Sequence, residues 1–540
     1  MGTYYTERDS LRFSCYTDRI FIVRRTEIIE RSQMIKRFIG LPFILLVSLL
    51  FPLSDGVADS SIASEKIAGE EALSKQERVF GLVTIYRGAK QHFVWFEQVP
   101  TLDWDKAFME YLPLVEKDQG LYDYYRLLQS FVALLEDGHS DIRMPSKIEK
   151  ELDALPLKLD LVEKQWVVIQ RYPVQEILDE DIPLGTVVLS IEGKSPSKYF
   201  QEKLFPYLSG GDEHQKQNAL NRRLFLRNTP LSMDMRYPDG SFHNRVLKAN
   251  RETVKWSDDL RQRFHSHSEV SSPYESGLLP DGLLYIRYSR CEDRYEKELS
   301  TLIESMSDNW PRAIIIDLRG NPGGNTPLKL IGHFISTPIK TGIRKTRCSI
   351  SELDSQLQTV IERDGLSPAV TEALNGAIEA GDLPKGYSPG WITSEGSIEP
   401  NPIHYDGPLY LLVDSGTASA AEDIVVILQG CGRATIVGTP TVGSTGNSIR
   451  FSLPGGGSVR ICVSQAKFAN GEDFIPMGVQ PDILLNRTIK GIIDSRDEIL
   501  ESALGFLKGN LQERVSNEMR EILQPTTPKN IETHIGEHKD

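Results

Sequence analysis

The chain has 540 residues, of which 61 are basic and 75 acidic, and its formal net charge at pH 7 is −14. That length is too great for a single ordinary hydrophobic core and predicts two to four domains. The apolar share of 40% and the charged share of 25% are typical of a globular protein. The acidic balance argues against nucleic acid and against anionic membrane surfaces as partners.

Residues 1–58 are predicted to be an N-terminal extension that ends in an export signal. A nearly unbroken apolar run, residues 38–53, follows two basic residues, and Gly56 and Ala58 occupy the −3 and −1 positions of a cleavage site. The run is short for a membrane span of ~20 residues. We interpret Met34 as the start of the protein and expect a periplasmic or secreted product. The alternative is an uncleaved signal that anchors the chain, and no other membrane contact is expected.

Residues 59–150 are predicted to form a helical N-terminal domain. Helical spacing of apolar residues runs from Asp103 to Glu116 and from Leu121 to Glu136, and Gly138 is expected to stop the second helix. His139 then lies on a loop just beyond that helix. A histidine titrates near neutral pH and can act as a general base. The alternative is a surface or capping histidine, whose positive charge interacts favourably with the dipole at the C-terminal end of the helix.

Residues 151–260 change to a β-rich pattern. Lys158 to Arg171 and Thr186 to Ile191 are rich in apolar and β-branched residues and predict strands, with Gly193 in the turn that follows. This region is either a binding domain or a plain β-rich spacer.

Residues 275–508 are predicted to form an α/β core, whose first strand is Leu283 to Tyr288. A second apolar run, Ala313 to Ile316, predicts a buried strand and leads into Asp317-Leu318-Arg319-Gly320-Asn321-Pro322-Gly323-Gly324. Thr326-Pro327-Leu328 then predicts a helix start. A glycine-rich turn between strand and helix presents backbone N–H groups that can hold an anion or the oxyanion of an acyl transfer.

A second strand–turn–helix unit follows further along the core. Leu409 to Val413 predicts a strand, Asp414 to Thr417 a turn, and Ser419 the start of a helix that ends at Gly430. A serine at a helix N-terminus lies in the positive end of the dipole, and the N–H of Ala420 points to where an oxyanion forms. Ser419 is therefore a candidate nucleophile, and the alternative is an ordinary small residue at a helix start.

The rest of the chain carries weaker signals. An insertion over residues 349–402, rich in Glu, Ser, Gly and Pro, is expected to form a lid or a surface excursion without a catalytic role. Val459 to Val463 predicts a strand, Arg496 to Phe506 a helix, and residues 509–540 a polar tail. No metal-ligand spacing such as H-E-x-x-H or C-x-x-C is present, so we expect neither a metal nor another cofactor.

The cysteines are few for a chain of this length. Of the five, only Cys15 precedes the predicted cleavage site. The others are expected to be buried free thiols rather than two disulfides. They are Cys291, Cys348, Cys431 and Cys462.

A family resemblance is carried by five motifs, which are LLEDGHS at 134–140, DLRGNPGG at 317–324, TASAAE at 417–422, ATIVGTPTVGSTG at 434–446 and MGVQPDI at 477–483. In order and spacing they resemble the C-terminal processing (tail-specific) serine peptidases. LLEDGHS resembles the tricorn-type and chlamydial-protease-like branch, in which a histidine is the base. The resemblance implies an α/β fold with a ClpP/crotonase-like β/α core, an N-terminal helical domain and a PDZ-like β-rich domain at 151–260.

The same resemblance implies roles for individual residues. It makes Ser419 the nucleophile and His139 the general base. It also implies that Gly323 or Gly324 and Ala420 supply the N–H groups of an oxyanion hole.

The third catalytic member is left open by the sequence. Ser444 stands where lysine-dependent relatives carry their base, so a Ser–Lys dyad is not expected. The glutamate that orients the histidine in the other branch has no counterpart just before Gly478. Asp137, Glu472, Asp473 and Ser444 remain as candidates.

We therefore expect an extracytoplasmic serine endopeptidase that cleaves peptides or unfolded proteins through an acyl-enzyme. The alternative is a catalytically inactive scaffold of the same fold that binds peptides or other ligands. An acyl-CoA enzyme of the crotonase type conflicts with the export signal, because CoA is a cytoplasmic cofactor. The sequence does not specify the cleavage preference or the oligomeric state.

Overall fold

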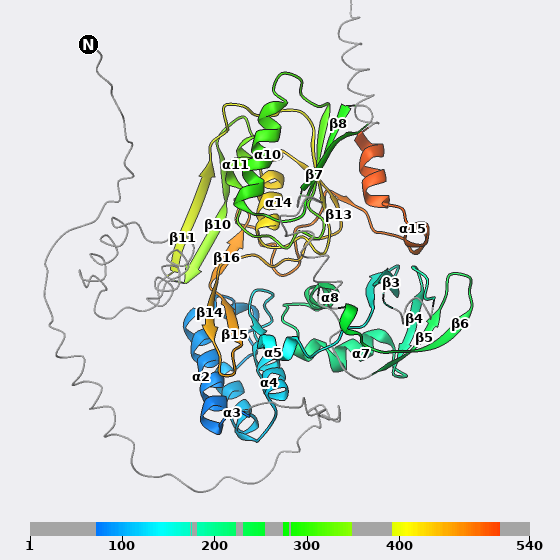
Figure 1. Ribbon diagram of the computed structural model, residues 1–540. Coiled ribbons are helices and arrows are strands. Elements are labelled where there is room, and N and C mark those ends of the chain that lie inside the picture. The colour runs from blue at the N-terminus through cyan, green and yellow to red at the C-terminus, as the bar shows by residue number, and fades with distance from the viewer. Residues whose placement is uncertain are drawn as a thin grey trace, which may run out of the picture. The chain divides into compact units, whose positions relative to one another are not determined.

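The computed structural model describes residues 72–172, 174, 181–222, 230–253, 274–279, 282–347 and 391–507, all of which belong to one compact unit (Figure 1). The predicted export signal, most of the predicted insertion and the predicted polar tail lie outside these ranges. Within the described ranges, no helix has both the length and the apolar character that crossing a membrane requires.

The N-terminal part is helical, as predicted. Ser74 and Glu77 form a capping box at the start of α2, and Asp103 caps α3 by accepting a backbone N–H at 2.9 Å. Trp104 of α3 stacks on Phe131 of α4 with ring centroids 4.2 Å apart, and both rings are buried. The elements are α2 (Lys75–His92), η2 (Phe96–Gln98), α3 (Trp104–Glu116), α4 (Leu121–Ala133), β1 (Asp141–Arg143) and α5 (Ser146–Glu149).

The end of α4 differs from the prediction. The helix stops at Ala133, with Leu134 as its C-cap, so Gly138 is not its stop signal. Glu136 adopts a φ of +48°, a conformation that non-glycine residues rarely take and that the sequence pattern did not indicate. His139 is therefore reached through a turn rather than directly from a helix end.

The following region is an antiparallel sheet of five strands in the order β2-β3-β4-β5-β6. The segment predicted as strand from Lys158 to Arg171 is a hairpin, because Glu163 and Lys164 both take a positive φ and form a two-residue turn. Trp166 packs edge-on against Phe200 in the core of this sheet. The elements are β2 (Leu157–Val162), β3 (Gln165–Arg171), β4 (Val187–Ile191), α7 (Pro196–Lys203), η3 (Phe205–Tyr207), α8 (Glu213–Arg222), β5 (Leu231–Arg236) and β6 (Phe242–Leu247).

A six-stranded sheet in the order β17-β13-β12-β9-β8-β7 forms the centre of the core. Five of its strands are parallel, and β7 is antiparallel to β8. The strand predicted to be the first, β8, is therefore preceded by β7, in which Leu278 is exposed and Leu279 is only partly buried. The elements are β7 (Tyr274–Leu279), β8 (Leu283–Tyr288), α10 (Asp293–Ser305), β9 (Ala313–Asp317), α11 (Leu328–Gly332), β12 (Leu409–Val413), α14 (Ala420–Gly430), β13 (Thr435–Gly438), β17 (Ile483–Leu484) and α15 (Ile489–Ile493).

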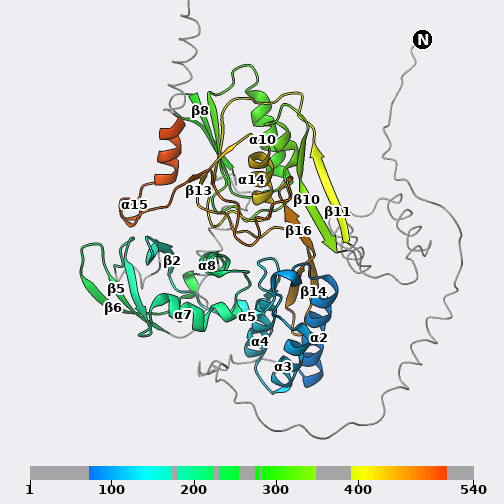
Figure 2. The same cartoon turned by 180° about the vertical axis from the view of Figure 1, so that it is seen from behind.

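Both faces of this sheet are covered by helices, which explains the unbroken apolar runs of β9 and β12. Ile314 and Ile316 lie in the core cluster with α10 and α14, whereas Ile315 packs with Ile499 and Ala503 from the helical residues 498–507. Figures 1 and 2 show α10 and α14 on one side of the sheet and the red-orange helical residues on the other. The fold is thus a mixed α/β layer structure.

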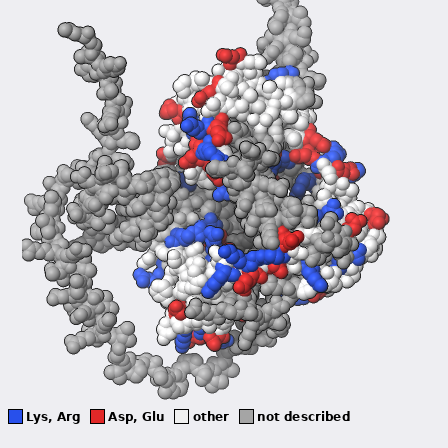
Figure 3. Space-filling model, in the orientation of Figure 1, with Lys and Arg blue, Asp and Glu red and all other residues white. Residues whose placement is uncertain are grey.

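Two small antiparallel sheets connect the remaining segments. One has the order β1-β15-β14, so that the strand just after His139 pairs with a strand of the core. The other has the order β11-β10-β16. The elements are β10 (Ile339–Arg347), β11 (Trp391–Ile398), β14 (Ser448–Ser452), β15 (Ser458–Cys462) and β16 (Ser464–Lys467). On the face in Figure 3, acidic and basic side chains of the described residues are interspersed.

Candidate active site

The two predicted strand–turn units lie side by side. β9 and β12 are neighbouring parallel strands, so the turns that follow Asp317 and Val413 meet at the same edge of the sheet. The N–H of Gly320 donates to the carboxylate of Asp414 at 2.8 Å, and the N–H of Ala418 donates to the carbonyl of Asn321 at 2.9 Å. The carboxyl ends of parallel strands are where α/β folds place their ligands.

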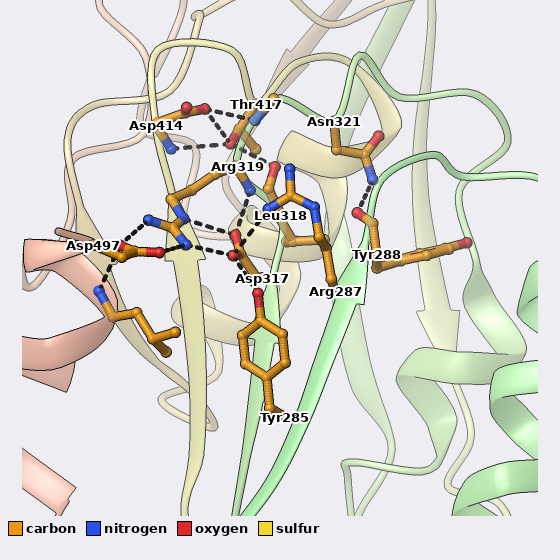
Figure 4. Close-up of polar contacts among 12 residues, drawn as sticks. Tyr285, Arg287, Tyr288, Asp317, Leu318, Arg319, Asn321, Asp414, Thr417 and Asp497 are labelled. Carbon is orange, nitrogen blue, oxygen red and sulfur yellow. Dashed lines mark hydrogen bonds and ion pairs between the residues drawn. The ribbon is translucent and has the colours of Figure 1, made fainter. Parts of the chain in front are cut away.

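The first turn is anchored by a buried ion-pair network (Figure 4). Asp317 is fully buried and accepts from Arg319 at 2.6 and 2.9 Å, and also from the hydroxyl of Tyr285 at 2.8 Å. Arg319 makes two further bonds of 2.7 Å to Asp497, which precedes the helical residues 498–507. Burial alone raises the pKa of Asp497, but the hydrogen bonds from Arg319 outweigh it and lower that pKa below its ordinary value.

The predicted nucleophile, Ser419, is the N-cap residue of α14. Its φ of +56° and ψ of −127° fall in a region that non-glycine residues rarely occupy. A strained turn between a strand and a helix is how α/β hydrolases expose a nucleophilic serine. The side chain is only partly buried.

The three backbone N–H groups predicted to bind the oxyanion differ in whether they already have an acceptor. The N–H of Gly323 donates to the side-chain oxygen of Asn321 at 2.8 Å, so it is already engaged. Among the described residues, no acceptor is found for the N–H groups of Gly324 and Ala420. These two groups are therefore the available donors of the predicted set.

Gly323 lies directly against the nucleophile. A Cβ atom placed on Gly323 would stand 2.6 Å from the Cβ of Ser419 and 2.7 Å from the carbonyl oxygen of Ala418. With a φ of +92°, the position also requires a backbone conformation that favours glycine. The contact explains why a glycine stands at this point of the motif.

The predicted base, His139, is buried and bonded to the loop that carries Ser444. Its Nδ1 lies 2.6 Å from the hydroxyl oxygen of Ser444. Gly138 permits this approach, because a Cβ there would come within 2.6 Å of the same hydroxyl. The carboxyl of Asp137 accepts hydrogen bonds from the backbone N–H of His139 and from the hydroxyl of Ser140. Burial raises the pKa of this carboxyl.

Ser444 brings the two predicted catalytic residues to one place. Its carbonyl accepts the N–H of Ser419 at 3.1 Å, and its hydroxyl contacts His139. Of the other candidates for a third member, Glu472 and Asp473 are exposed, and Asp473 pairs with Lys467 at 2.9 Å.

Glu422 is a functional candidate that the sequence reasoning missed. Its fully buried carboxylate accepts from the Thr441 hydroxyl and the Gly443 N–H at 2.6 Å each, from the Ser444 N–H at 3.0 Å and from the Ser419 N–H at 3.1 Å. The spacing Ser419-x-x-Glu422 is that of a capping box, which is the signal that could have identified it. Glu422 thus ties the turn of the predicted nucleophile to the loop that contacts the predicted base.

Glu422 is expected to make stability depend on pH. Burial, opposed by the four hydrogen bonds, raises its pKa from 4.5 to about 7. Between these two values the folded state holds a proton that the unfolded state has released, so this residue's contribution to stability falls as pH rises. The fall is roughly 3 kcal/mol at 1.36 kcal/mol per pKa unit.

The measurement compares urea unfolding of the wild type and Glu422→Gln at pH 5 and pH 7.5. Groups common to both proteins cancel, so the free energy of unfolding should fall more steeply with pH in the wild type. Equal slopes would mean that the four donors cancel the effect of burial, so that the pKa of Glu422 is not raised.

The three cysteines within the described residues are free thiols, as predicted, although only two are buried. Cys291 and Cys462 are buried and Cys431 is exposed, while Cys348 lies outside the described residues.

Comparison with known proteins relates the core of the chain to one peptidase family. The pattern of peptidase family S41 matches residues 282–485. The carboxyl-terminal-processing protease of Synechocystis sp. is 25% identical over 269 residues, which are 49% of this chain and 53% of the relative. A Chlamydia pneumoniae protein is 24% identical over 255 residues, 41% of this chain and 40% of that protein. The chain thus spans about half, or less, of the length of these curated relatives.

The fold has a solved counterpart. Mature CPAF, a chlamydial protease solved in complex with lactacystin, superposes with a TM-score of 0.60 at 16% identity, over 81% of this chain and 98% of CPAF. This likeness shows a shared fold. Residues 282–485 are therefore identified as a serine-type peptidase domain of family S41, the family of the C-terminal processing peptidases.

Proposed function

We propose that this protein is a serine endopeptidase in which Ser419 is the nucleophile and His139 the general base. One observation carries the proposal. Ser444 accepts the N–H of Ser419, which has a strained backbone, and at the same time holds Nδ1 of His139. The other predicted elements of a serine peptidase are grouped around this residue.

The proposal takes Nδ1 of His139 as the donor in its contact with Ser444. When Nδ1–H donates to the Ser444 hydroxyl, Nε2 is the unprotonated nitrogen and accepts the proton of Ser419. Ser419 then attacks the scissile carbonyl, forming the C–O bond of a tetrahedral intermediate. His139 returns the proton to the leaving amine as the C–N bond breaks, and water resolves the acyl-enzyme by the same route.

The oxyanion of that intermediate is held by the N–H groups of Gly324 and Ala420. Such donors each contribute about 3 kcal/mol in serine peptidases. The N–H of Gly323 is held by Asn321, so Gly323 contributes by its lack of a side chain beside Ser419.

Ser444 is the third member in this proposal. Its hydroxyl fixes the orientation of His139, as an aspartate or glutamate does in a conventional triad, but it carries no charge to stabilise the imidazolium. We therefore expect a slower enzyme than one with a carboxylate in this position.

The substrate class and setting are part of the same proposal. Peptides and unfolded proteins are the substrates, in line with the names of the carboxyl-terminal-processing relatives. The core is of the ClpP/crotonase type, and residues 151–260 form a PDZ-like domain that binds an extended peptide by strand addition. The mature protein is extracytoplasmic. It is either released when the signal peptide is removed after Ala58 or anchored to the membrane through residues 38–53.

A fluorophosphonate probe, which reacts with activated serines, tests the proposal. The purified wild type should be labelled and Ser419→Ala should not. Ser415→Ala is the matched control, because Ser415 lies in the same turn and has no role in the mechanism. Labelling that persists in Ser419→Ala would contradict the assignment. A folded wild type that is never labelled would favour the inactive binding scaffold.

A single methyl group beside the nucleophile should also slow the enzyme. Gly323→Ala places a Cβ 2.6 Å from that of Ser419, and a shift of about 1 Å at a reacting group costs on the order of 10²-fold in rate. Gly320→Ala is the control, because Gly320 has a similar φ of +72° but open space where its Cβ would lie. The measurement is degradation of fluorescently labelled casein. Equal losses in both variants would assign the effect to backbone strain and not to the contact with Ser419.

A further inference from the structure

Helix α8 makes direct contact with the loop that connects the two predicted catalytic residues. The helix belongs to the segment between β4 and β5 of the five-stranded sheet, and the loop runs from Thr441 to Ser444. Gln215 of α8 has a side chain that is only 2% exposed. Its amide nitrogen donates to the carbonyl of Gly443 and, at 3.1 Å, to that of Pro476.

The other polar atom of Gln215 is also used. Its Oε1 accepts the N–H of Gly211 at 2.7 Å, just before α8 begins. One buried amide therefore satisfies two carbonyls from the core and one N–H of its own segment. Only a side chain that both donates and accepts at this length can do so, which explains a glutamine at this place.

A second contact reinforces the first. Nε2 of the neighbouring His214 lies 3.0 Å from the carbonyl oxygen of Thr441. The carbonyls of Thr441 and Gly443 thus face α8, whereas the hydroxyl of Thr441 and the N–H of Gly443 face Glu422. The loop is clamped between a carboxylate of the core on one side and α8 on the other.

The turn of His139 is packed against the same helix. A Cβ on Gly138 would lie 2.6 Å from the Ser444 hydroxyl and 3.3 Å from Oε1 of Gln215. A Cβ on Gly211 would lie 2.8 Å from the carbonyl oxygen of Glu136. There is no room for the loop or the turn to shift toward α8, so the position of the helix fixes the separation of Ser444 and His139.

We propose that Gln215 is a positioning residue for catalysis, which holds the Thr441–Ser444 loop so that the Ser444 hydroxyl meets Nδ1 of His139. Gln215 touches neither the substrate nor the reacting atoms. It acts through Gly443, whose carbonyl it binds next to Ser444 in the chain. The inference rests on the proposed function, because it concerns the same serine and histidine.

The test replaces Gln215 by methionine, which keeps the length of the side chain and removes its hydrogen bonds. Gln217→Met is the matched control, because Gln217 lies on the same helix and its amide donates within the helix to Glu213 at 3.3 Å. We expect Gln215→Met to lower kcat for labelled casein by on the order of 10- to 100-fold, as misplaced catalytic groups do, with KM nearly unchanged. Gln217→Met should match the wild type.

Three further readouts separate positioning from stability. The thermal midpoint gives the folded fraction at the assay temperature, the pH profile of kcat/KM reports the base, and the labelling rate with a fluorophosphonate reports activation of Ser419. Positioning predicts a shifted acid limb in the pH profile and slower labelling of protein that is fully folded.

The inference is overturned if Gln215→Met keeps the kcat and pH profile of an active wild type, or if its loss of activity only follows the unfolded fraction. An inactive wild type would overturn the proposed function and this inference with it. The two failures are therefore distinguishable in one experiment.

Discussion

Ser419→Ala is expected to lower kcat by at least about 10³-fold, and His139→Ala by a similar factor. The removal of either member of a serine–histidine pair costs ~10⁶-fold in enzymes with a complete triad, and loss of the orienting carboxylate alone costs ~10⁴-fold. Because Ser444 offers His139 a neutral partner, the kcat of the wild type is expected to be lower than that of an enzyme with a complete triad. The loss of kcat in either variant is therefore expected to be smaller than ~10⁶-fold.

The double variant Ser419→Ala/His139→Ala should be no slower than either single variant. Two residues that act in one proton transfer are strongly non-additive, because the second substitution removes nothing that still functions. The measurement is initial rates of labelled casein degradation, with near-UV circular dichroism to verify that each variant is folded. Losses that multiply in the double variant would show that the two residues act independently and would exclude His139 as the base of Ser419.

Arg319→Met is expected to destabilise the fold by about 3 kcal/mol. The guanidinium is largely buried and makes bonds of 2.6 to 2.9 Å to Asp317 and Asp497. Breaking a buried ion pair by removing one partner costs about 3–5 kcal/mol, because the other charge stays buried without compensation. The lower end applies, since Asp317 keeps the Tyr285 hydroxyl and an ion pair with Arg287 at 3.4 Å, and Asp497 is partly exposed.

Arg496→Met is the matched control for this prediction. Arg496 lies one residue before Asp497 and pairs with Glu501 at 3.1 Å, but both side chains of that pair are about half exposed. Exposed pairs contribute little to stability. Urea unfolding of both variants measures the difference. Equal unfolding midpoints for Arg319→Met and the wild type would mean that the network fixes the conformation of the turn after Asp317 without stabilising the fold.

The buried strands and the first helices could be predicted because their pattern is local. β9 and β12 are apolar on both faces, since helices cover both, and this leaves a continuous apolar run in the sequence. The helix predicted from Asp103 to Glu116 runs from Trp104 to Glu116, and Asp103 is its N-cap. β7 was missed because its two leucines are adjacent rather than alternating with polar residues, and Leu278 is exposed.

Contacts between distant segments could not be predicted in the same way. Gln215 meets Gly443 and Pro476 across more than two hundred residues, and nothing in the residues around it marks a buried amide. Asn321 likewise reaches another segment, since its amide nitrogen donates to the carbonyl of Tyr288 at 2.8 Å. The choice of Ser444 from among the candidates also needed the fold, because only the fold brings it to His139.

The pairing of β1 with β15 has a consequence for how the protein can be divided. The segment that matches the family pattern, residues 282–485, contains Ser419 and Ser444 but not His139, which lies just before β1, the strand that pairs with β15. On the proposed mechanism, an isolated 282–485 fragment lacks the general base and is therefore expected to be inactive. On that mechanism, activity requires the segment that carries His139 to pack against this core through β1 and β15.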